Sequence, residues 1–254
     1  MEQAIQEFSK IFDNKTIAVI GPSPHLKKKK LGSYFDEFDL TVRINEIIKK
    51  SDSQIDYGKN NDVIFISIPD MSIKYYKQLF LNAEEELSRV QHFICPRHSL
   101  HVSPFHLQDF DKSKNIFKNF KKLKLNHNLL HIGDSENEKL EKDIGFHPTT
   151  GTLSLSYLLN FNFKKLYIGG FSFYLTKNRY HNKKAKLMKK SVDNKKINKL
   201  PPGHKYLDEI IYLQKIFHNK NNVQGDEWFT KLILEKKFNL ENYNKNSSFK
   251  INSI

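Results

Sequence analysis

Two threonines and a glycine, Thr149, Thr150 and Gly151, stand directly before an apolar pattern of helical spacing over residues 153–158. A helix that begins with such residues leaves backbone N–H groups unpaired in its first turn. These groups attract anions, most often phosphates. The sequence therefore predicts either a phosphate-binding helix start or an ordinary helix N-cap, in which a threonine hydroxyl accepts from these N–H groups.

Further polar candidates follow the first predicted strands. Gly21 and Ser23 come directly after the buried strand 16–20, where doubly wound α/β proteins hold nucleotide phosphates. Neither a GxGxxG pattern nor a Walker lysine motif is present, so neither dinucleotide nor P-loop chemistry is supported. Asn45 ends the second strand and offers a donor and an acceptor, although strand-end asparagines also serve as turn formers. Arg43, on the same strand, is either a ligand contact or part of a structural ion pair.

Strands and helices alternate along most of the chain. Short apolar runs predict strands, and apolar residues at helical spacing predict helices between them. Besides the helix after Gly151, the expected strands cover residues 16–20, 38–45, 62–67, 92–95, 129–132 and 166–168, and the expected helices cover 1–14, 73–90, 113–124 and 204–217. Such alternation is typical of an α/β fold with a Rossmann-like, mostly parallel sheet and helices on both faces.

A change of composition separates residues 175–203 from their surroundings. This stretch has many lysines and almost no apolar periodicity, and it ends at a Pro-Pro-Gly sequence. We expect it to form a flexible lid inserted into a single domain of residues 1–254. His204 then lies at the edge of the lid, where a helix begins. Glu209, on that helix, either orients nearby backbone or lysines or faces solvent.

The chain is basic, with a net charge of +14 and 38% hydrophobic residues in 254. Lysines concentrate at residues 27–30, 118–124 and 183–199, which indicates local patches and not one continuous stripe. A nucleotide, an anionic glycan, an anionic membrane surface or a nucleic acid would suit such patches equally, and compositional bias alone would also produce them. Cys95, the single cysteine, excludes an internal disulfide and is expected in the core.

No metal site is predicted. His98, His101 and His106 lie close together in sequence, but they lack a carboxylate partner at suitable spacing. Asp109-Phe-Asp111 falls in an irregular segment and not at a strand end. The chain also lacks a long apolar run and a signal-peptide pattern, so we expect a soluble, cytoplasmic protein, with peripheral contact at the inner face of an anionic membrane and homo-oligomerisation both left open.

Together these segments resemble the sialyltransferases, both the animal-type family with its sialyl motifs and the bacterial lipooligosaccharide family, which share a GT-A-variant fold. Residues 17–26, with Gly32, Asp36, Asp39, Arg43 and Asn45, are similar to the long sialyl motif, which holds a cytidine nucleotide. Pro148–Gly151, running to Gly170-Phe171, looks like the short motif. His204 and Glu209 have the spacing of the very short motif.

The bacterial family provides a finer match. In it, two tyrosines six positions apart bind the leaving phosphate, and a histidine preceded by glycine at the lid end is the catalytic base. The resemblance assigns these roles to Tyr174, Tyr180 and His204. Ser67 and Ser172 align with a family asparagine and aspartate, respectively, that take part in substrate binding. Pro22 replaces an asparagine of the first glycine turn, so one nucleotide contact is either missing or made by Ser23.

The resemblance implies an inverting, metal-independent enzyme that transfers sialic acid from CMP-sialic acid to a hydroxyl of a lipooligosaccharide or capsule-type glycan. The CMP-activated sugar is then the donor substrate, no cofactor is needed, and no nucleic acid is a partner. One alternative is a transferase that uses CMP-Kdo or another CMP-nonulosonic acid. The other is a basic nucleic-acid-binding protein without catalysis, in which the sialyl-like motifs are vestigial.

Overall fold

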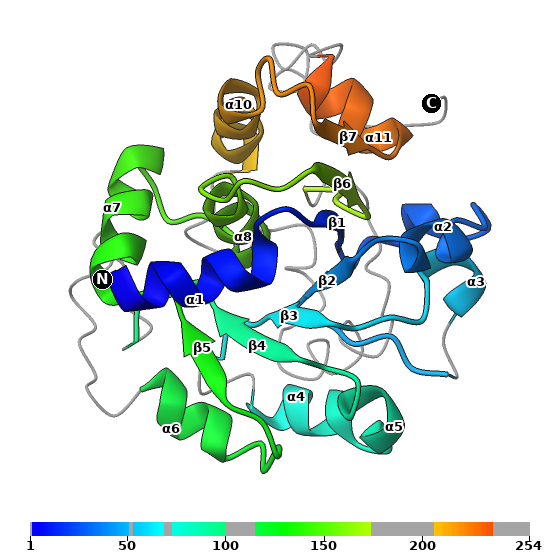
Figure 1. Ribbon diagram of the computed structural model, residues 1–254, viewed down its shortest axis with the longest axis vertical. Helices are drawn as coiled ribbons and strands as arrows, with labels where there is room; N and C mark the ends of the chain where they lie inside the picture. The colour runs from blue at the N-terminus through cyan, green and yellow to red at the C-terminus, as the bar shows by residue number, and fades with distance from the viewer. Residues whose placement is uncertain (1, 51–52, 69–72, 100–114, 174–205, 236–254) are drawn as a thin grey trace, which may run out of the picture.

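A seven-stranded sheet in which every described strand pair is parallel forms the centre of the molecule (Figure 1). The computed structural model describes residues 2–50, 53–68, 73–99, 115–173 and 206–235. The strands are β1 (Thr16–Ile20), β2 (Leu40–Ile44), β3 (Val63–Phe65), β4 (His92–Cys95), β5 (Leu129–His131), β6 (Lys165–Gly169) and β7 (Val223–Gly225). Their order is β5-β4-β3-β2-β1-β6-β7. The predicted α/β class with a parallel sheet is thereby confirmed.

The sheet order reverses direction at β1. From β1 the chain builds outward through β2 to β5, and later returns to the other side of β1 with β6 and β7. Ile17 of β1 consequently pairs with Leu40 of β2 and with Leu166 of β6. Such a reversal is a topological switch point, beside which open α/β sheets bind their ligands at the carboxyl ends of the strands.

Alternate residues of each strand pack on opposite faces, as the period of a β-strand requires. Ile17 and Val19 point to one face, where their core cluster includes residues of α1, α8 and α10. Ala18 and Ile20 point to the other face, against α2 and α3. Further helices cover this second face beside β3 and β4. The helices are α1 (Glu2–Phe12), α2 (Gly32–Asp36), α3 (Gln54–Tyr57), α4 (Ile73–Phe80), α5 (Glu84–Leu87), α6 (Ile116–Lys121), α7 (Asp134–Ile144), α8 (Thr150–Leu158), α10 (Tyr206–Ile216) and α11 (Glu227–Phe229).

One predicted helix is broken in the structure, and the sequence analysis did not predict α2, α3, α7 or α11. The single helix expected over 73–90 is broken, because Asn82 adopts a left-handed backbone conformation, φ 55°, between α4 and α5. Helix α7 was not predicted, since its sequence is too polar to show an apolar stripe. Its two end signals were present: acidic Asp134 in the first turn, and Gly145, whose left-handed conformation caps the last.

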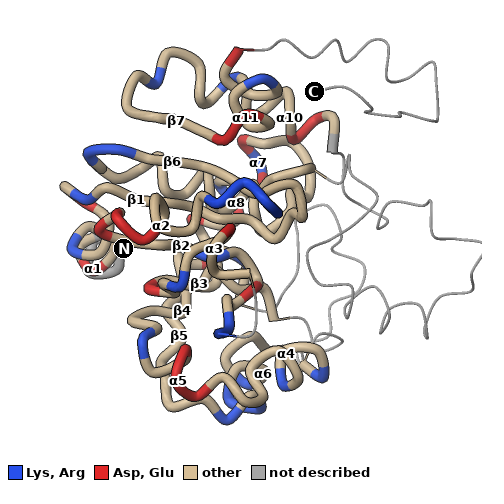
Figure 2. The backbone as a smooth tube through the Cα atoms, turned by 90° about the vertical axis from the view of Figure 1, so that its right-hand side faces the viewer, with Lys and Arg blue, Asp and Glu red and all other residues tan. Residues whose placement is uncertain are grey.

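The charge pattern and the cysteine follow the prediction where they are described. Figure 2 shows the basic residues in separate groups, one of which lies on α6 and includes exposed Lys118 and Lys121. Cys95 is fully buried, and this burial raises the pKa of its thiol to about 12, which makes it a packing residue. Among the described helices, none has the length and apolar character needed to cross a bilayer. The expected lid, 175–203, lies outside the described residues.

Candidate functional site

Four candidate residues lie at one edge of the sheet. Gly21 follows β1, Asn45 follows β2, Ser67 comes shortly after β3, and Ser172 comes shortly after β6. Since all four strands are parallel, their carboxyl ends meet at the same edge. This edge includes the switch point between β1 and β6, the expected place for a ligand in a doubly wound sheet.

At the switch point the backbones of Gly21 and Gly170 are in close contact. Gly21 N donates to Gly169 O at 2.8 Å, and Ser23 N donates to Gly170 O at 2.9 Å. A Cβ atom on Gly21 would stand 2.4 Å from Gly170 O, and one on Gly170 would stand 2.4 Å from Gly21 O. Gly170 also has a φ of 74°, so both positions require glycine.

A chain of polar side chains continues from Ser23. Ser23 Oγ lies 2.8 Å from His25 Nδ1, and His25 Nε2 lies 2.7 Å from Asp226 Oδ2. Sequence reasoning missed both His25 and Asp226. The available signal was the position of Asp226, because an aspartate directly before α11 is a typical N-cap, and its Oδ1 does accept from Phe229 N at 2.7 Å. Ser23 is buried, and its nucleotide contact stays a prediction.

Asn45 joins the ends of β2 and β3. Its Oδ1 accepts from Ser67 N at 2.8 Å, and the Tyr76 hydroxyl lies 3.0 Å from the same oxygen and 2.8 Å from Ser67 O. With a φ of 54°, Asn45 is the turn former that the sequence allowed. The Asn45 amide nitrogen makes no hydrogen bond within the part of the chain that the structure describes, so this nitrogen can donate a hydrogen bond to a ligand.

Arg43 has a structural role in the part of the chain that the structure describes, and whether it also forms an ion pair or contacts a ligand stays a prediction. The side chain is 1% exposed, and its guanidinium donates to the backbone oxygens of Tyr57, Gly58 and Asn60. It therefore fixes the loop between α3 and β3 behind the edge of the sheet.

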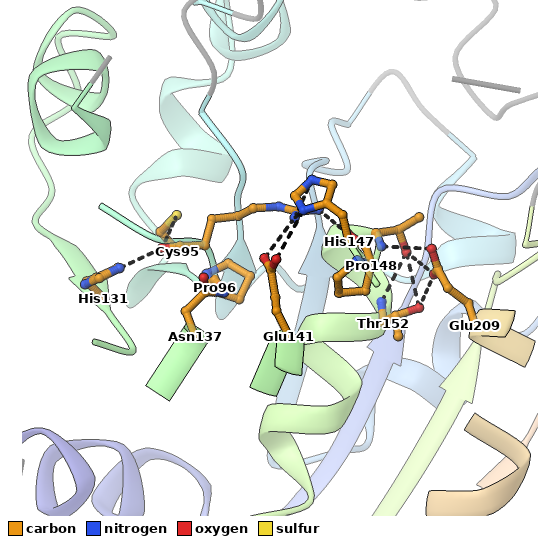
Figure 3. A network of polar contacts seen from close by, with 11 residues as sticks. Cys95, Pro96, His131, Asn137, Glu141, His147, Pro148, Thr152 and Glu209 are labelled. Atoms are coloured by element: carbon orange, nitrogen blue, oxygen red, sulfur yellow. Dashed lines mark hydrogen bonds and ion pairs between the residues drawn. The ribbon is translucent and has the colours of Figure 1, made fainter. Parts of the chain in front are cut away.

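The helix start at Thr149 is a true N-cap and is bound by a carboxylate (Figure 3). The Thr149 hydroxyl accepts from Thr152 N at 3.3 Å. Glu209 Oε1 accepts from Thr149 N at 2.9 Å, while its Oε2 accepts from the hydroxyls of Thr149 at 2.7 Å and of Thr152. Glu209 is 1% exposed, so the solvent-facing alternative is wrong and it orients local backbone instead.

The next two amides of α8 stay available to an anion. Glu209 takes up the N–H of Thr149, but the N–H groups of Thr150 and Gly151 have no acceptor among the residues that the structure describes. A Cβ on Gly151 would stand 2.9 Å from the ring of Phe171, which follows β6. The helix start therefore packs directly beside the switch point, next to half-buried Ser172.

A second buried network supports the segment that leads into α8. Arg97, which follows β4, donates to Pro148 O at 2.6 Å and to the ring of His147. Arg97 also forms an ion pair with Glu141 of α7 at 3.7 Å, with both side chains buried. Figure 3 shows this network running beside the Glu209 contacts, from the end of β4 to the start of α8. Contacts from α7 and α10 therefore hold residues 147–152 from both sides.

Three predicted site residues, Tyr174, Tyr180 and His204, lie outside the described residues. The same holds for His101 and His106. His98 is described, and it lies 3.6 Å from Asp134 and 3.4 Å from Glu138. Within residues 2–50, 53–68, 73–99, 115–173 and 206–235, no group of three or more His, Cys, Asp or Glu side chains is arranged to hold a metal ion.

The strand order and the carboxyl edge define a doubly wound α/β domain with its switch point between β1 and β6. A mammalian sialyltransferase shares this fold, with a TM-score of 0.51 and 15% identity over 88% of this chain and 78% of that chain. A mammalian sialyltransferase in complex with Gal-beta-1-3GalNAc-ortho-nitrophenol overlaps over the same shares, with a TM-score of 0.47 and 15% identity. No protein-family model and no curated protein matches the sequence. The sialyltransferase-like fold implied by the sequence motifs is thus confirmed.

Proposed function

We propose that this chain is an inverting, metal-independent glycosyltransferase that moves sialic acid from CMP-sialic acid to a hydroxyl of a glycan. The observation that carries the proposal is the convergence of Gly21, Asn45 and the α8 start on one edge of a sialyltransferase-like fold. The α8 start lies more than a hundred positions after both Gly21 and Asn45 in the sequence, and the sequence motifs assign a nucleotide contact to all three. Within the described residues the N–H groups of Thr150 and Gly151 are unpaired, as at the start of any helix, and at this edge they are available to an anion.

The proposed reaction divides its tasks among donors and a base. The Asn45 amide nitrogen binds the nucleotide, and the N–H groups of Thr150 and Gly151 face its phosphate. The acceptor hydroxyl attacks the anomeric carbon of the sugar acid, the bond to the phosphate breaks, and CMP leaves with the electron pair. His204 takes the hydroxyl proton, while Tyr174 and Tyr180 donate hydrogen bonds to the departing phosphate.

A turnover assay tests this function. Purified protein is incubated with CMP-sialic acid and a galactoside, and free CMP is measured. We expect acceptor-dependent release that falls at least about 100-fold in His204→Ala, the usual contribution of a positioned base. His218→Ala is the matched control, because His218 is exposed just beyond α10 and should leave turnover unchanged. Full activity of His204→Ala would remove this residue from the mechanism.

A donor panel separates the close alternatives. CMP-Kdo and other CMP-nonulosonic acids are assayed beside CMP-sialic acid, with products identified by mass spectrometry. The transferase proposal also predicts thermal stabilisation by CMP, and only weak affinity for DNA or RNA at physiological salt. Steeply salt-dependent nucleic-acid binding without any CMP effect would favour the non-catalytic alternative.

The acceptor and location are part of the same proposal. A transferase that works in the cytoplasm would meet a lipid-linked or capsular glycan at the inner face of the membrane. Exposed lysines at residues 27–30 would attract the anionic lipid there. Sedimentation with anionic and with neutral vesicles tests this, because binding to both alike would contradict an electrostatic contact. Light scattering in the same buffer gives the oligomeric state.

A further inference from the structure

Ser23, His25 and Asp226 form a continuous hydrogen-bonded chain that the proposed reaction does not use. The distances are 2.8 Å from Ser23 Oγ to His25 Nδ1 and 2.7 Å from His25 Nε2 to Asp226 Oδ2. Ser23 and Asp226 are 4% and 6% exposed, and the His25 side chain is 18% exposed. Trp228 stacks on the imidazole with ring centroids 5.8 Å apart. Two distant parts of the chain, residues 23–25 and 226–228, therefore fix one imidazole beside the switch point.

The carboxylate determines where the imidazole carries its proton. Asp226 Oδ2 also accepts from Gly170 N at 2.8 Å, and its Oδ1 accepts from Phe229 N at 2.7 Å. A carboxylate surrounded by donors acts only as an acceptor, so His25 Nε2 must carry a proton. In the neutral form of the ring the lone pair lies at Nδ1, and the Ser23 hydroxyl donates its single proton to it. Asp226 thus sets the direction of both hydrogen bonds.

A serine–histidine–aspartate chain also occurs in hydrolases, but the surroundings of Ser23 do not suit a nucleophile. Its hydroxyl is buried, and its backbone N–H, which could otherwise stabilise an oxyanion, is bonded to Gly170 O at 2.9 Å. The backbone oxygen of Ser23 is also engaged, since it accepts from the Tyr57 hydroxyl at 2.9 Å. Every polar group of Ser23 therefore serves to hold the turn that follows β1.

We infer that His25 is a positioning residue for the proposed nucleotide site at the switch point, and that Asp226 controls it through the imidazole tautomer. With Nε2 protonated, His25 holds Ser23, and Ser23 holds the Gly21–Ser23 turn against Gly170. Asp226 also accepts directly from Gly170 N, so one carboxylate positions both the turn after β1 and the segment after β6. The inference rests on the proposed function for its ligand, a cytidine monophosphate bound at the switch point.

Asp226→Asn separates tautomer control from helix capping. Asparagine caps a helix about as well as aspartate, so α11 should remain formed. If Oδ1 still accepts from Phe229 N, the amide nitrogen takes the place of Oδ2, where it donates to Nε2, forces the proton onto Nδ1 and reverses the hydrogen bond to Ser23. Gly170 N loses its acceptor in the same variant. We expect heteronuclear NMR to show the Nε2–H tautomer in the wild type and the Nδ1–H tautomer in the variant. We also expect CMP affinity to fall about tenfold, the effect of one lost hydrogen bond.

His25→Gln and the double variant test whether the residues act as one unit. Glutamine can reach Asp226 but offers no ring nitrogen to Ser23, so its CMP affinity should also fall about tenfold. The double variant should bind CMP no more weakly than either single one, since residues of one unit are not additive. Binding is followed by calorimetry and by fluorescence of Trp228, the single tryptophan. His92→Gln, on β4, is the matched control and should bind like the wild type.

The outcomes separate this inference from the proposed function. A wild type that shows no CMP binding contradicts the proposed function, and the Ser23–His25–Asp226 chain is then judged on the tautomer alone. An unchanged tautomer in Asp226→Asn overturns the inference, as do wild-type CMP affinities in both single variants. Additive losses would show two independent structural contacts. Labelling of Ser23 by a fluorophosphonate would overturn it in favour of a hydrolytic nucleophile.

Discussion

The carboxyl edge of the sheet has two halves, the β2–β3 side and the β1–β6 side, and the contacts that stabilise them differ in sequence separation. On the β2–β3 side, Asn45 accepts from Ser67 N, 22 positions later. On the β1–β6 side, Glu209 accepts from Thr149, 60 positions earlier, and Asp226 binds His25, 201 positions earlier. One half is therefore assembled by neighbouring βα units, whereas the other needs the C-terminal helices in place.

This difference gives the C-terminal segment a role beyond packing. Glu209 of α10 orders the start of α8, and Asp226 orders the turn after β1 and the chain after β6. Both segments border the switch point. We therefore expect ligand binding at this edge to depend on the docking of α10 and α11, and the β2–β3 side to be independent of it.

The largest effect is expected from Glu209→Ala. The change leaves the Thr149 amide and the hydroxyls of Thr149 and Thr152 without their acceptor, in a site that is 1% exposed at Glu209. Buried donors without partners are costly, so the free energy of unfolding should fall by about 3 kcal/mol. Urea denaturation measures it. Lys215→Ala, an exposed change on the same helix, should cost less than about 0.5 kcal/mol. A small effect at Glu209 would break the comparison.

Asp226→Ala should rank second. It removes the N-cap of α11 and the acceptor for Gly170 N and His25, and we expect a loss of about 2 kcal/mol. Chemical denaturation gives this value, with Glu227→Ala as the control because Glu227 is an exposed neighbour. Hydrogen exchange should then be faster at Gly170 while remaining unchanged at Ser67, if the two halves are independent. Equal acceleration at both sites would show that they form one unit.

The pH dependence of stability should report on Glu209, which belongs to the β1–β6 side. Burial raises the pKa of the Glu209 carboxyl, against the lowering effect of hydrogen bonds from Thr152 and Thr149. The folded state therefore binds the Glu209 carboxyl proton more tightly than the unfolded chain does. The stability that this proton contributes is fully present below pH 4.5, the ordinary pKa of the carboxyl. It is lost as the pH rises through the raised pKa of the folded state. Relative to Glu209→Gln, the wild type should lose at most about 1.4 kcal/mol per pH unit across this window. Parallel stability curves for the two proteins would contradict this.

The position of Asn45 on the β2–β3 side could be predicted from the sequence, whereas the long-range contacts of the β1–β6 side could not. Apolar runs placed β1 and β4 at their observed bounds, and parallel strands put Gly21 and Asn45 on one edge. Nothing local shows that the carboxylate of Glu209 reaches Thr149, because a helix pattern does not reveal which element packs on its polar residues. The sequence left Glu209 open between two roles for this reason. His25 was overlooked because its partner, Asp226, follows β7, a strand of three residues without a visible apolar run.

The smallest change in stability, and the sharpest test of the β2–β3 half, comes from Asn45→Asp. Aspartate keeps an oxygen for Ser67 N and Tyr76, and it tolerates the left-handed conformation that Asn45 adopts. We therefore expect unfolding to change by less than about 0.5 kcal/mol. The variant lacks the amide donor, however, so CMP affinity should fall about tenfold. Calorimetry measures the CMP affinity. Asn45→Gly is the matched variant, because glycine keeps the turn but lacks both the side-chain oxygen and the amide donor. In Asn45→Gly, stability and CMP affinity should therefore fall together. Wild-type affinity in Asn45→Asp would mean that Asn45 serves only the fold, and the ligand contacts would then be confined to the half that the C-terminal carboxylates assemble.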